Sequence, residues 1–368
     1  MGIQDWAPGL LSIDLDAIAS NYRYLKERAG ASSCAAVVKA DAYGLGAPRI
    51  AQRLREEGCG IFFVAHLAEG LDLRAALGAD PEIYVLNGTP PGAEGEFLAA
   101  GIVSVVNNLQ ELNGWRRLAS TQGRVLPVAI QVDTGMSRLG LAPADVARLH
   151  AERRGLEGLR VKLTMSHLAC AEEPARPANQ SQLEEFVRLR RAFPSVPASL
   201  ANSSGIFLGP GFHFDIVRAG AALYGINPVP GGPNPMRHAA SLKARVLQIR
   251  EVPAGAGVGY GLTARLDRPR RLATLSLGYA DGWLRGNTAG AWYGSEALPA
   301  VGRVSMDSMV VDVTAVPVGQ IRAGCFVDLI GPSQTVDQVA AASGTIGYEV
   351  LCRVGRRIFR SYSSDPAS

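Results

Sequence analysis

The chain has 368 residues and a formal net charge of +4 at pH 7, with 47% hydrophobic and 19% charged residues. This composition is typical of a globular protein that forms two domains, or one large barrel with an appendage. The small net charge and the scattered arginines argue against nucleic-acid binding, and no apolar run reaches the length of a membrane span. The first residues lack the basic and apolar regions of a signal peptide, and the five cysteines include no C-x-x-C pair. We therefore expect a cytoplasmic protein with reduced, buried thiols.

From residue 12 to about residue 235, apolar runs of strand length alternate with segments of helical period. The strand candidates are 34–38, 61–65, 82–86, 102–106, 125–132, 160–165, 197–201 and 214–219. The helical segments among them are 47–58, 67–78, 110–120, 145–155 and 180–193. Continuous apolar strands separated by helices are typical of a parallel sheet covered on both faces. Eight such units favour an α/β fold with a (β/α)8 TIM-like barrel, and an open doubly wound sheet stays possible.

A Pro/Gly-rich stretch, "INPVPGGPNPMRHA", ends this pattern and is typical of a linker. After it, residues 241–252, 271–282, 309–316 and 324–331 alternate apolar and polar positions, which favours antiparallel strands. No comparable helical segment appears until 335–344. The sequence thus predicts a barrel over residues 1–235 and a mostly-β domain over residues 236–368.

Chemistry in such a barrel is expected at the carboxyl ends of the strands, where the loops gather. Lys39, one of only four lysines in the chain, ends the first strand candidate. Tyr43 follows four residues later, and the other strand ends supply polar and glycine positions at Asp133, Arg138, His167, Asn202, Ser203, Arg218, Gly220 and Tyr224. Each of these alone is more often structural, but their convergence on one face favours function.

The set suits one cofactor class. A lysine amine forms a Schiff base with an aldehyde, and pyridoxal phosphate is the commonest aldehyde cofactor. The segments "NSSG" and "RAGA" offer hydroxyl and backbone N–H groups for a phosphate, and Arg138 suits a substrate carboxylate. No zinc-binding H-E-x-x-H, phosphate-binding P-loop or hydrolase G-x-S-x-G motif competes, and we expect no metal.

Taken in order, the motifs resemble those of the alanine racemase family over essentially the whole chain. They are "VVKADAYGLG", "VDTGMSRLG", "SHLACAEE", "ANSSG" and "VRAGAALYG", followed by "VGYGLTA", "LGYADGW", "GRVSMDSMVVDV" and "TIGYEVLCRVGRRI". The resemblance implies a pyridoxal-phosphate enzyme that interconverts L- and D-alanine and supplies D-alanine for peptidoglycan. It also implies a TIM-like barrel, a C-terminal β domain, and a head-to-tail homodimer with shared active sites.

The same resemblance implies roles for individual residues. Lys39 carries the cofactor and is one catalytic base, and Tyr260 of the partner subunit is the other, because racemisation needs a base on each face of the substrate. His167 and Arg218 support Tyr260, and Arg218 also faces the pyridine nitrogen. The cofactor-binding set is Lys39, Tyr43, Arg138, His167, Asn202, Ser203, Arg218, Gly220, Ala221 and Tyr348. The substrate-binding set is Arg138, Met306, Tyr260, Asp307 and Tyr279, with Tyr279 and Tyr348 narrowing the access path toward small amino acids.

Two positions depart from the family pattern. Gln131 stands where many members have a lysine, carbamylated in some, so we expect hydrogen bonds in place of a negative charge to hold Arg138. Leu45 stands where the family usually has a histidine. Three alternatives stay open: a broad-specificity or serine racemase of the same fold, a barrel-type amino-acid decarboxylase, and a non-catalytic pyridoxal-phosphate carrier.

Overall fold

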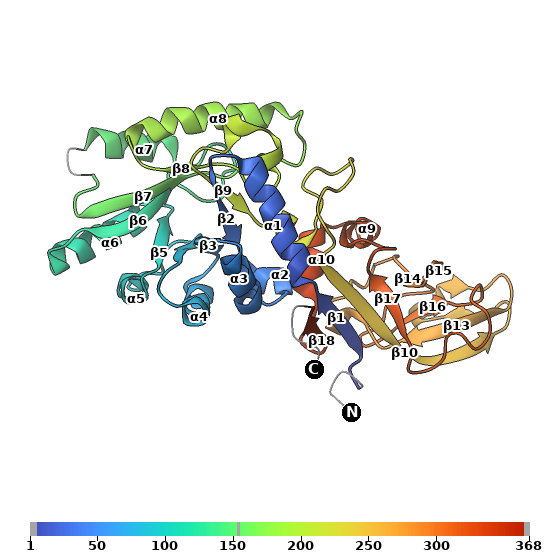
Figure 1. Cartoon of the computed structure of the whole chain (residues 1–368). Coiled ribbons are helices and arrows are strands. Elements are labelled where there is room, and N and C mark those ends of the chain that lie inside the picture. The colour runs from blue at the N-terminus through green and yellow to red at the C-terminus, as the bar shows by residue number, and fades with distance from the viewer. Residues whose placement is uncertain (1–5, 153–154, 364–368) are drawn as a thin grey trace. The chain divides into compact units, whose positions relative to one another are not determined.

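The computed structural model describes residues 6–152 and 155–363, and Figure 1 presents the chain. Two compact units can be distinguished, and each is described by itself. The barrel unit comprises residues 18–223 and 227–236, and the β unit comprises the described parts of 1–17, 224–226 and 237–368. The prediction that the first residues belong to the barrel is wrong. Strand β1 (Gly9–Ile13) pairs antiparallel with β10 (Ala240–Val252) and parallel with β18 (Phe359–Tyr362), so it belongs to the β unit.

The barrel unit holds an eight-stranded parallel sheet, which confirms the predicted fold class. Its strands in chain order are β2 (Ser33–Val37), β3 (Ile61–Val64), β4 (Glu82–Val85), β5 (Val103–Val106), β6 (Leu126–Gln131), β7 (Leu159–Met165), β8 (Ala198–Ser199) and β9 (Ile216–Ala219). Neighbours in sequence are neighbours in the sheet from β2 to β8, and β9 pairs with β2. Next to β8, the backbone N–H groups of Asp215 and Arg218 donate to the carbonyls of Ala198 and Ala201, both at 3.0 Å. These bonds join the last two strands, which excludes the open doubly wound alternative.

Helices follow the strands, as the helical periods predict. The α-helices are α1 (Leu15–Ala29), α2 (Lys39–Gly44), α3 (Ala47–Glu56), α4 (Leu67–Leu77), α5 (Glu94–Ala99), α6 (Leu109–Gln122), α7 (Pro143–Ala151), α8 (Pro177–Leu189), α9 (Val336–Ala342) and α10 (Gly347–Arg353). Short 3-10 turns lie at Arg190–Ala192, Gly205–Phe207, Pro210–Phe212, Ala221–Tyr224, Tyr260–Leu262 and Tyr279–Asp281. Among the barrel helices, α1, α2 and α5 were not predicted, and residues 40–43 of α2 have the left-handed backbone described below.

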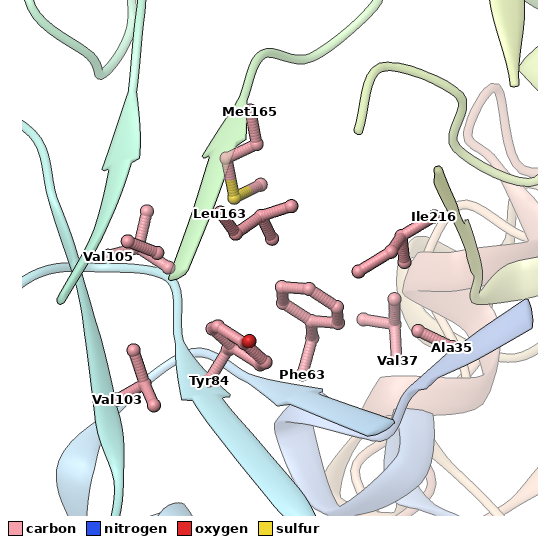
Figure 2. Close-up of a cluster of buried hydrophobic side chains, with 10 residues drawn as sticks. Ala35, Val37, Phe63, Tyr84, Val103, Val105, Leu163, Met165 and Ile216 are labelled. Atoms are coloured by element: carbon pink, nitrogen blue, oxygen red, sulfur yellow. The ribbon is translucent and has the colours of Figure 1, made fainter. Parts of the chain in front are cut away.

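Alternate strand residues fill the interior of the barrel, and Figure 2 shows this cluster. Its members are Ala35, Val37, Phe63, Tyr84, Val103, Val105, Ala129, Leu163, Met165 and Ile216. The rings of Phe63 and Tyr84 stack with centroids 5.0 Å apart. Residues between these positions, such as Cys34, Phe62 and Val128, are also buried. Burial on both sides explains why the strands read as unbroken apolar runs.

The β unit centres on the long strand β10. This strand pairs with β1 and β17 (Phe326–Ile330) along its first half and with β13 (Arg270–Leu275) along its second. Further strands of the unit are β14 (Ala291–Tyr293), β15 (Glu296–Leu298) and β16 (Met309–Asp312), and a separate hairpin is formed by β11 (Gly257–Val258) and β12 (Ala264–Arg265). The predicted mostly-β character is confirmed.

Two further observations concern the whole described chain. No helix within residues 6–152 and 155–363 combines the length and apolar character that crossing a membrane requires. None of the five cysteines, all of which lie within the described residues, is in a disulfide, and Cys34 and Cys59 are buried as predicted. The prediction of burial is wrong for Cys352, which is exposed near the end of α10.

Candidate active site

Lys39 lies at the carboxyl end of β2 and is followed by a left-handed backbone turn. Residues Ala40, Asp41, Ala42 and Tyr43 all have φ between 52° and 57°, although none is a glycine. A left-handed conformation costs a non-glycine residue about 1–2 kcal/mol. The turn is held by backbone bonds from Ala42 to Val38 and from Gly46 to Asp41, both 2.9 Å. Such strain persists only where the surroundings over-determine it, which is typical of functional sites.

The other end of the turn carries Tyr43, whose side chain is buried against the loop after β9. A Cβ atom built on Gly220 would lie 2.9 Å from the Tyr43 hydroxyl, so only glycine permits this approach. Ser203 Oγ accepts hydrogen bonds from the backbone N–H groups of Gly220 (2.9 Å) and Ala222 (3.2 Å). Residues that follow three strands thus bring hydroxyl and amide groups close together.

The groups around Ser203 and Gly220 include the donors that a phosphate needs. The hydroxyl of Ser204 is buried and has no hydrogen-bond partner among the described residues. Ala221 is buried beside Gly220 at the start of a 3-10 turn. Asn202 acts as a cap, since its Oδ1 accepts the Gly205 N–H at 2.8 Å. Buried hydroxyls, backbone N–H groups and a glycine that admits close approach are compatible with a bound phosphate group.

Arg218 is a buried cation on β9. Its Nη1 donates to Ser199 Oγ at 2.6 Å, and its Nη2 donates to the backbone carbonyl of Ser166 at 2.7 Å and to that of Leu200 at 3.3 Å. Burial lowers the pKa of Arg218 to about 9, which still leaves the guanidinium protonated at neutral pH. Neutral acceptors therefore hold a positive charge in the barrel mouth.

His167 lies next to Arg218, with its Nδ1 3.2 Å from Arg218 Nη2. Because a guanidinium can only donate, Nδ1 accepts, and the ring proton belongs on Nε2. Burial, together with the charges of Arg218, Arg138 and Lys39, lowers the pKa of His167 well below its usual range. The imidazole is therefore neutral at physiological pH. Because all three charges act on the His167 ring, Arg218, Arg138 and Lys39 lie near it at the carboxyl ends of the barrel strands.

Arg138 is exposed on a loop whose backbone is firmly held. Asp133 Oδ1 accepts the N–H groups of three loop residues, Gly135, Met136 and Ser137, at 2.9–3.1 Å. Gln131 Nε2 donates to the carbonyl of Leu139 at 3.1 Å, and Leu141 N–H donates back to the Gln131 carbonyl at 2.8 Å. The expected hydrogen bonds are thus made by Gln131, but to the loop backbone beside Arg138.

The remaining predicted residues lie in the β unit. Tyr260 is at the tip of the β11–β12 hairpin, between Gly259 and Gly261, and 63% of its surface is exposed. Tyr348, on α10, is half-buried. The predicted site residues therefore form two groups, one on each unit.

Tyr279, Met306 and Asp307 come from two loops of the β unit that are bonded together. Tyr279 N–H donates to the Ser305 carbonyl at 3.0 Å, and Ala280 N–H donates to the Met306 carbonyl at 2.9 Å. Arg357 bridges the loops, donating to Asp307 Oδ1 at 2.7 Å and to Asp281 Oδ1 at 2.9 Å. The two loops thus form one braced surface.

Several supporting residues were not predicted. Gln182, on α8, donates to Thr134 Oγ1 (3.1 Å) and to the His167 carbonyl (2.9 Å), and accepts from Ala169 N–H (2.8 Å). It is buried, and a buried polar residue on the inner face of a helix is a signal that the sequence carries. Ser199 and Glu69 offer no such signal, because their bonds to Arg218 and Ala40 arise only in the folded chain. Among the residues described, no group of three or more metal-binding side chains is found.

Comparison with known proteins accounts for this arrangement. The family model described as alanine racemase, N-terminal domain, matches residues 13–228, and the model described as alanine racemase, C-terminal domain, matches residues 239–362. The chain belongs to the alanine racemase family. This confirms the resemblance drawn from the motifs.

Individual members of the alanine racemase family are similar along nearly the whole chain. A relative from Mesorhizobium japonicum, named "Alanine racemase, catabolic", is 55% identical over 356 residues, covering 97% of this chain and 93% of its own length. An alanine racemase from Rhodospirillum rubrum is 45% identical over 365 residues, covering 98% of each. The crystal structure of alanine racemase from Bartonella henselae with covalently bound pyridoxal phosphate has a TM-score of 0.93 at 41% identity, covering 97% of this chain and 99% of that chain.

Proposed function

We propose that this chain is an alanine racemase that works with pyridoxal phosphate and interconverts L- and D-alanine. The observation that carries the proposal is the barrel mouth, where Lys39 on its left-handed turn meets the Arg218–His167 pair. Family membership and the cofactor named for the Bartonella henselae enzyme support the same conclusion. Once the substrate amine has replaced the lysine on its aldehyde carbon, pyridoxal phosphate would withdraw electrons from the substrate and so acidify the Cα proton.

The residues of the barrel mouth fit this cofactor. Lys39 would hold it covalently, and the hydroxyl and amide groups around Tyr43, Ser203, Gly220 and Ala221 would hold its phosphate. Arg218 would donate a hydrogen bond to the pyridine nitrogen. A guanidinium that stays protonated cannot accept a proton there, so Arg218 would orient the ring without exchanging protons with it.

Moving the proton needs two bases, because it leaves one face of the substrate and returns on the other. We assign Lys39 to one face and Tyr260 of the partner subunit to the other. His167, neutral and with Nε2–H as its remaining donor, would hold the tyrosine oxygen in place. Arg138 and the backbone of Met306 of the partner subunit would bind the substrate carboxylate, and Asp307, Tyr279 and Tyr348 would line the access path.

A homodimer with shared sites follows from the position of Tyr260. The exposed large apolar side chains of the β unit include Tyr260 (63%), Leu262 (59%) and Met306 (53%). Exposed apolar groups of this size favour a protein contact, and a second copy of the chain would cover them. Sedimentation at micromolar concentration should give a dimer, and a monomer that remains active would overturn this assignment.

Two further aspects of the function are proposals. The five cysteines, none of which is in a disulfide, favour a reducing compartment, the cytoplasm. The motif resemblance predicts D-alanine supply for peptidoglycan, whereas the name of the Mesorhizobium japonicum relative favours alanine breakdown. Deleting the gene distinguishes them: a requirement for added D-alanine supports wall synthesis, and loss of growth on alanine as carbon source supports breakdown.

The proposed activity is tested by proton exchange in deuterated water. With enzyme and pyridoxal phosphate, L-alanine should gain deuterium at Cα, and D-alanine should appear. Repeating the measurement with serine decides whether the enzyme is a broad-specificity racemase. Exchange with neither amino acid, or loss of carbon dioxide, would overturn the proposal in favour of a carrier or a decarboxylase.

A further inference from the structure

The left-handed turn after Lys39 connects two residues of the proposed active site. Lys39 stands before its first residue, Ala40, and Tyr43 is its last. Because all four residues are in an unfavourable conformation, the turn needs outside support to persist. Where that support attaches determines which part of the turn is rigid.

Glu69, on the first turn of α4, supplies a bond to the start of the turn. Its Oε1 accepts the backbone N–H of Ala40 at 2.7 Å. Its Oε2 accepts the N–H groups of Ala65 (2.7 Å) and His66 (3.1 Å), at the end of β3 and the start of α4. One carboxylate therefore ties the residue after Lys39 to the neighbouring strand end. Bonds from N–H to an ionised carboxylate are about twice as strong as neutral ones.

A second carboxylate shows what Glu69 adds. Glu111 occupies the same third position of α6, two strands along the barrel, where its Oε2 accepts the N–H of Asn107 at 3.0 Å. Its Oε1 accepts from Asn108 Nδ2 at 2.6 Å, within the same cap. Glu111 therefore caps its helix and also contacts the backbone of Thr89 in the loop after β4, which carries none of the predicted site residues. Glu69 caps α4 and also reaches Ala40, 29 residues away in sequence.

We propose that Glu69 is a positioning residue for Lys39. By holding the Ala40 N–H, its carboxylate fixes the peptide plane between Lys39 and Ala40, and with it the direction in which the lysine side chain leaves the backbone. The inference rests on the proposed function of Lys39. It adds that the alignment of this amine depends on a carboxylate from a different βα unit.

Replacement by glutamine separates the two roles of Glu69. All three partners of the carboxylate are N–H donors, and an amide has only one oxygen. In a Glu69→Gln variant the oxygen is expected to keep the two bonds at Ala65 and His66, so the NH2 group then faces Ala40 N–H. The cap of α4 survives, and the tie to the turn is lost.

The experiment compares Glu69→Gln with the matched control Glu111→Gln in the full-length protein. The first measurement is hydrogen exchange of the peptide that contains the Ala40 amide, without cofactor. We expect about tenfold faster exchange of this amide in Glu69→Gln and no change in Glu111→Gln. Unchanged protection in Glu69→Gln would overturn the proposal.

The second measurement is the rate at which pyridoxal phosphate attaches to Lys39, trapped with borohydride and located by peptide mass. The third is the steady-state rate with L-alanine. A misaligned amine should lower the attachment rate and kcat about 10- to 100-fold, with KM and thermal stability matching those of Glu111→Gln. A variant that equals the control in both rates would mean that Glu69 only caps α4, which overturns the proposal.

The outcome for Glu69 is distinguishable from that for the proposed function. If the wild type attaches the cofactor but does not racemise alanine, the proposed function fails, and the exchange and attachment measurements still decide the role of Glu69. If the wild type racemises alanine and Glu69→Gln behaves like the control, the proposed function stands and the positioning role fails.

Discussion

The barrel mouth and the Tyr260 hairpin differ in how completely the chain builds them. Around Arg218 and His167, every contact named above comes from a buried or half-buried neighbour in the same unit. Tyr260 stands on a glycine-flanked tip, mostly exposed. One half of the proposed site is thus organised within a single chain, and the other half is presented outward. This difference is the basis for proposing that one base is aligned by folding and the other by assembly.

Removing the Lys39 amine should have the largest effect on the racemisation rate. Lys39→Ala deletes both the covalent attachment point and one base, so racemisation should fall by about four orders of magnitude or more. The control Lys26→Ala changes an exposed lysine and should be silent. Chiral chromatography of the product measures the rate, and retained borohydride-trapped cofactor in Lys39→Ala would contradict the assignment.

Removing the Tyr260 hydroxyl should affect only the base that we assign to the partner subunit. Tyr260→Phe should lower racemisation about 10²- to 10⁴-fold while leaving thermal stability unchanged, because the side chain is exposed in the single chain. One isomer should still exchange its Cα proton without inversion, since one base remains. Tyr293→Phe, which loses a hydroxyl bonded to the Gln320 carbonyl, is the control. Equal loss of exchange for both isomers would argue against a one-face role.

The proposed phosphate site can be tested by substituting Gly220. In Gly220→Ala the new methyl group would lie 2.9 Å from the Tyr43 hydroxyl, so we expect about tenfold weaker binding of pyridoxal phosphate. Gly211 has open space around it and no positive φ, which makes Gly211→Ala the matched control. Titration of the cofactor by absorbance gives both affinities, and equal values would place the phosphate elsewhere.

The neutral state of His167 predicts a pH dependence of stability. Its pKa is lowered below the ordinary value of 6.5, so below that pH the unfolded chain binds a proton that the folded chain resists. The stability from this residue is complete above pH 6.5 and is lost as the pH falls, by about 1.4 kcal/mol per pH unit until the folded-state pKa is reached. His167→Gln should flatten this loss in urea unfolding between pH 5 and 7 relative to His150→Gln. Parallel curves for the two variants would mean that His167 is not held neutral.

The smallest expected effect concerns the loop of Arg138. Gln131→Ala removes one hydrogen bond to the Leu139 carbonyl, worth about 1 kcal/mol, which should raise KM for alanine about fivefold and leave kcat unchanged. Gln122→Ala, at an exposed position, is the control. A fall in kcat without a change in KM would mean that Gln131 acts on the reacting groups and not on carboxylate binding.

The sequence predicted the barrel well, because each of its strands is buried on both sides and so reads as an apolar run. It also predicted the strand-end residues that surround His167. It did not predict the pairing of β1, whose partner strands lie more than 200 residues away. Nor did it predict the left-handed turn, since "ADAY" contains no glycine or asparagine, or the bond from Glu69 to Ala40. These features depend on tertiary contacts that override local preference.

The division of the site between two chains is tested most directly with mixed dimers. Lys39→Ala and Tyr260→Phe chains, each inactive and carrying different tags, are co-expressed, and the doubly tagged dimer is isolated. If Tyr260 serves the partner's barrel, one of the two sites has both bases, and the mixed dimer should show about half of the wild-type activity. If Tyr260 serves its own barrel, every site lacks one base, and an inactive mixed dimer would contradict the account.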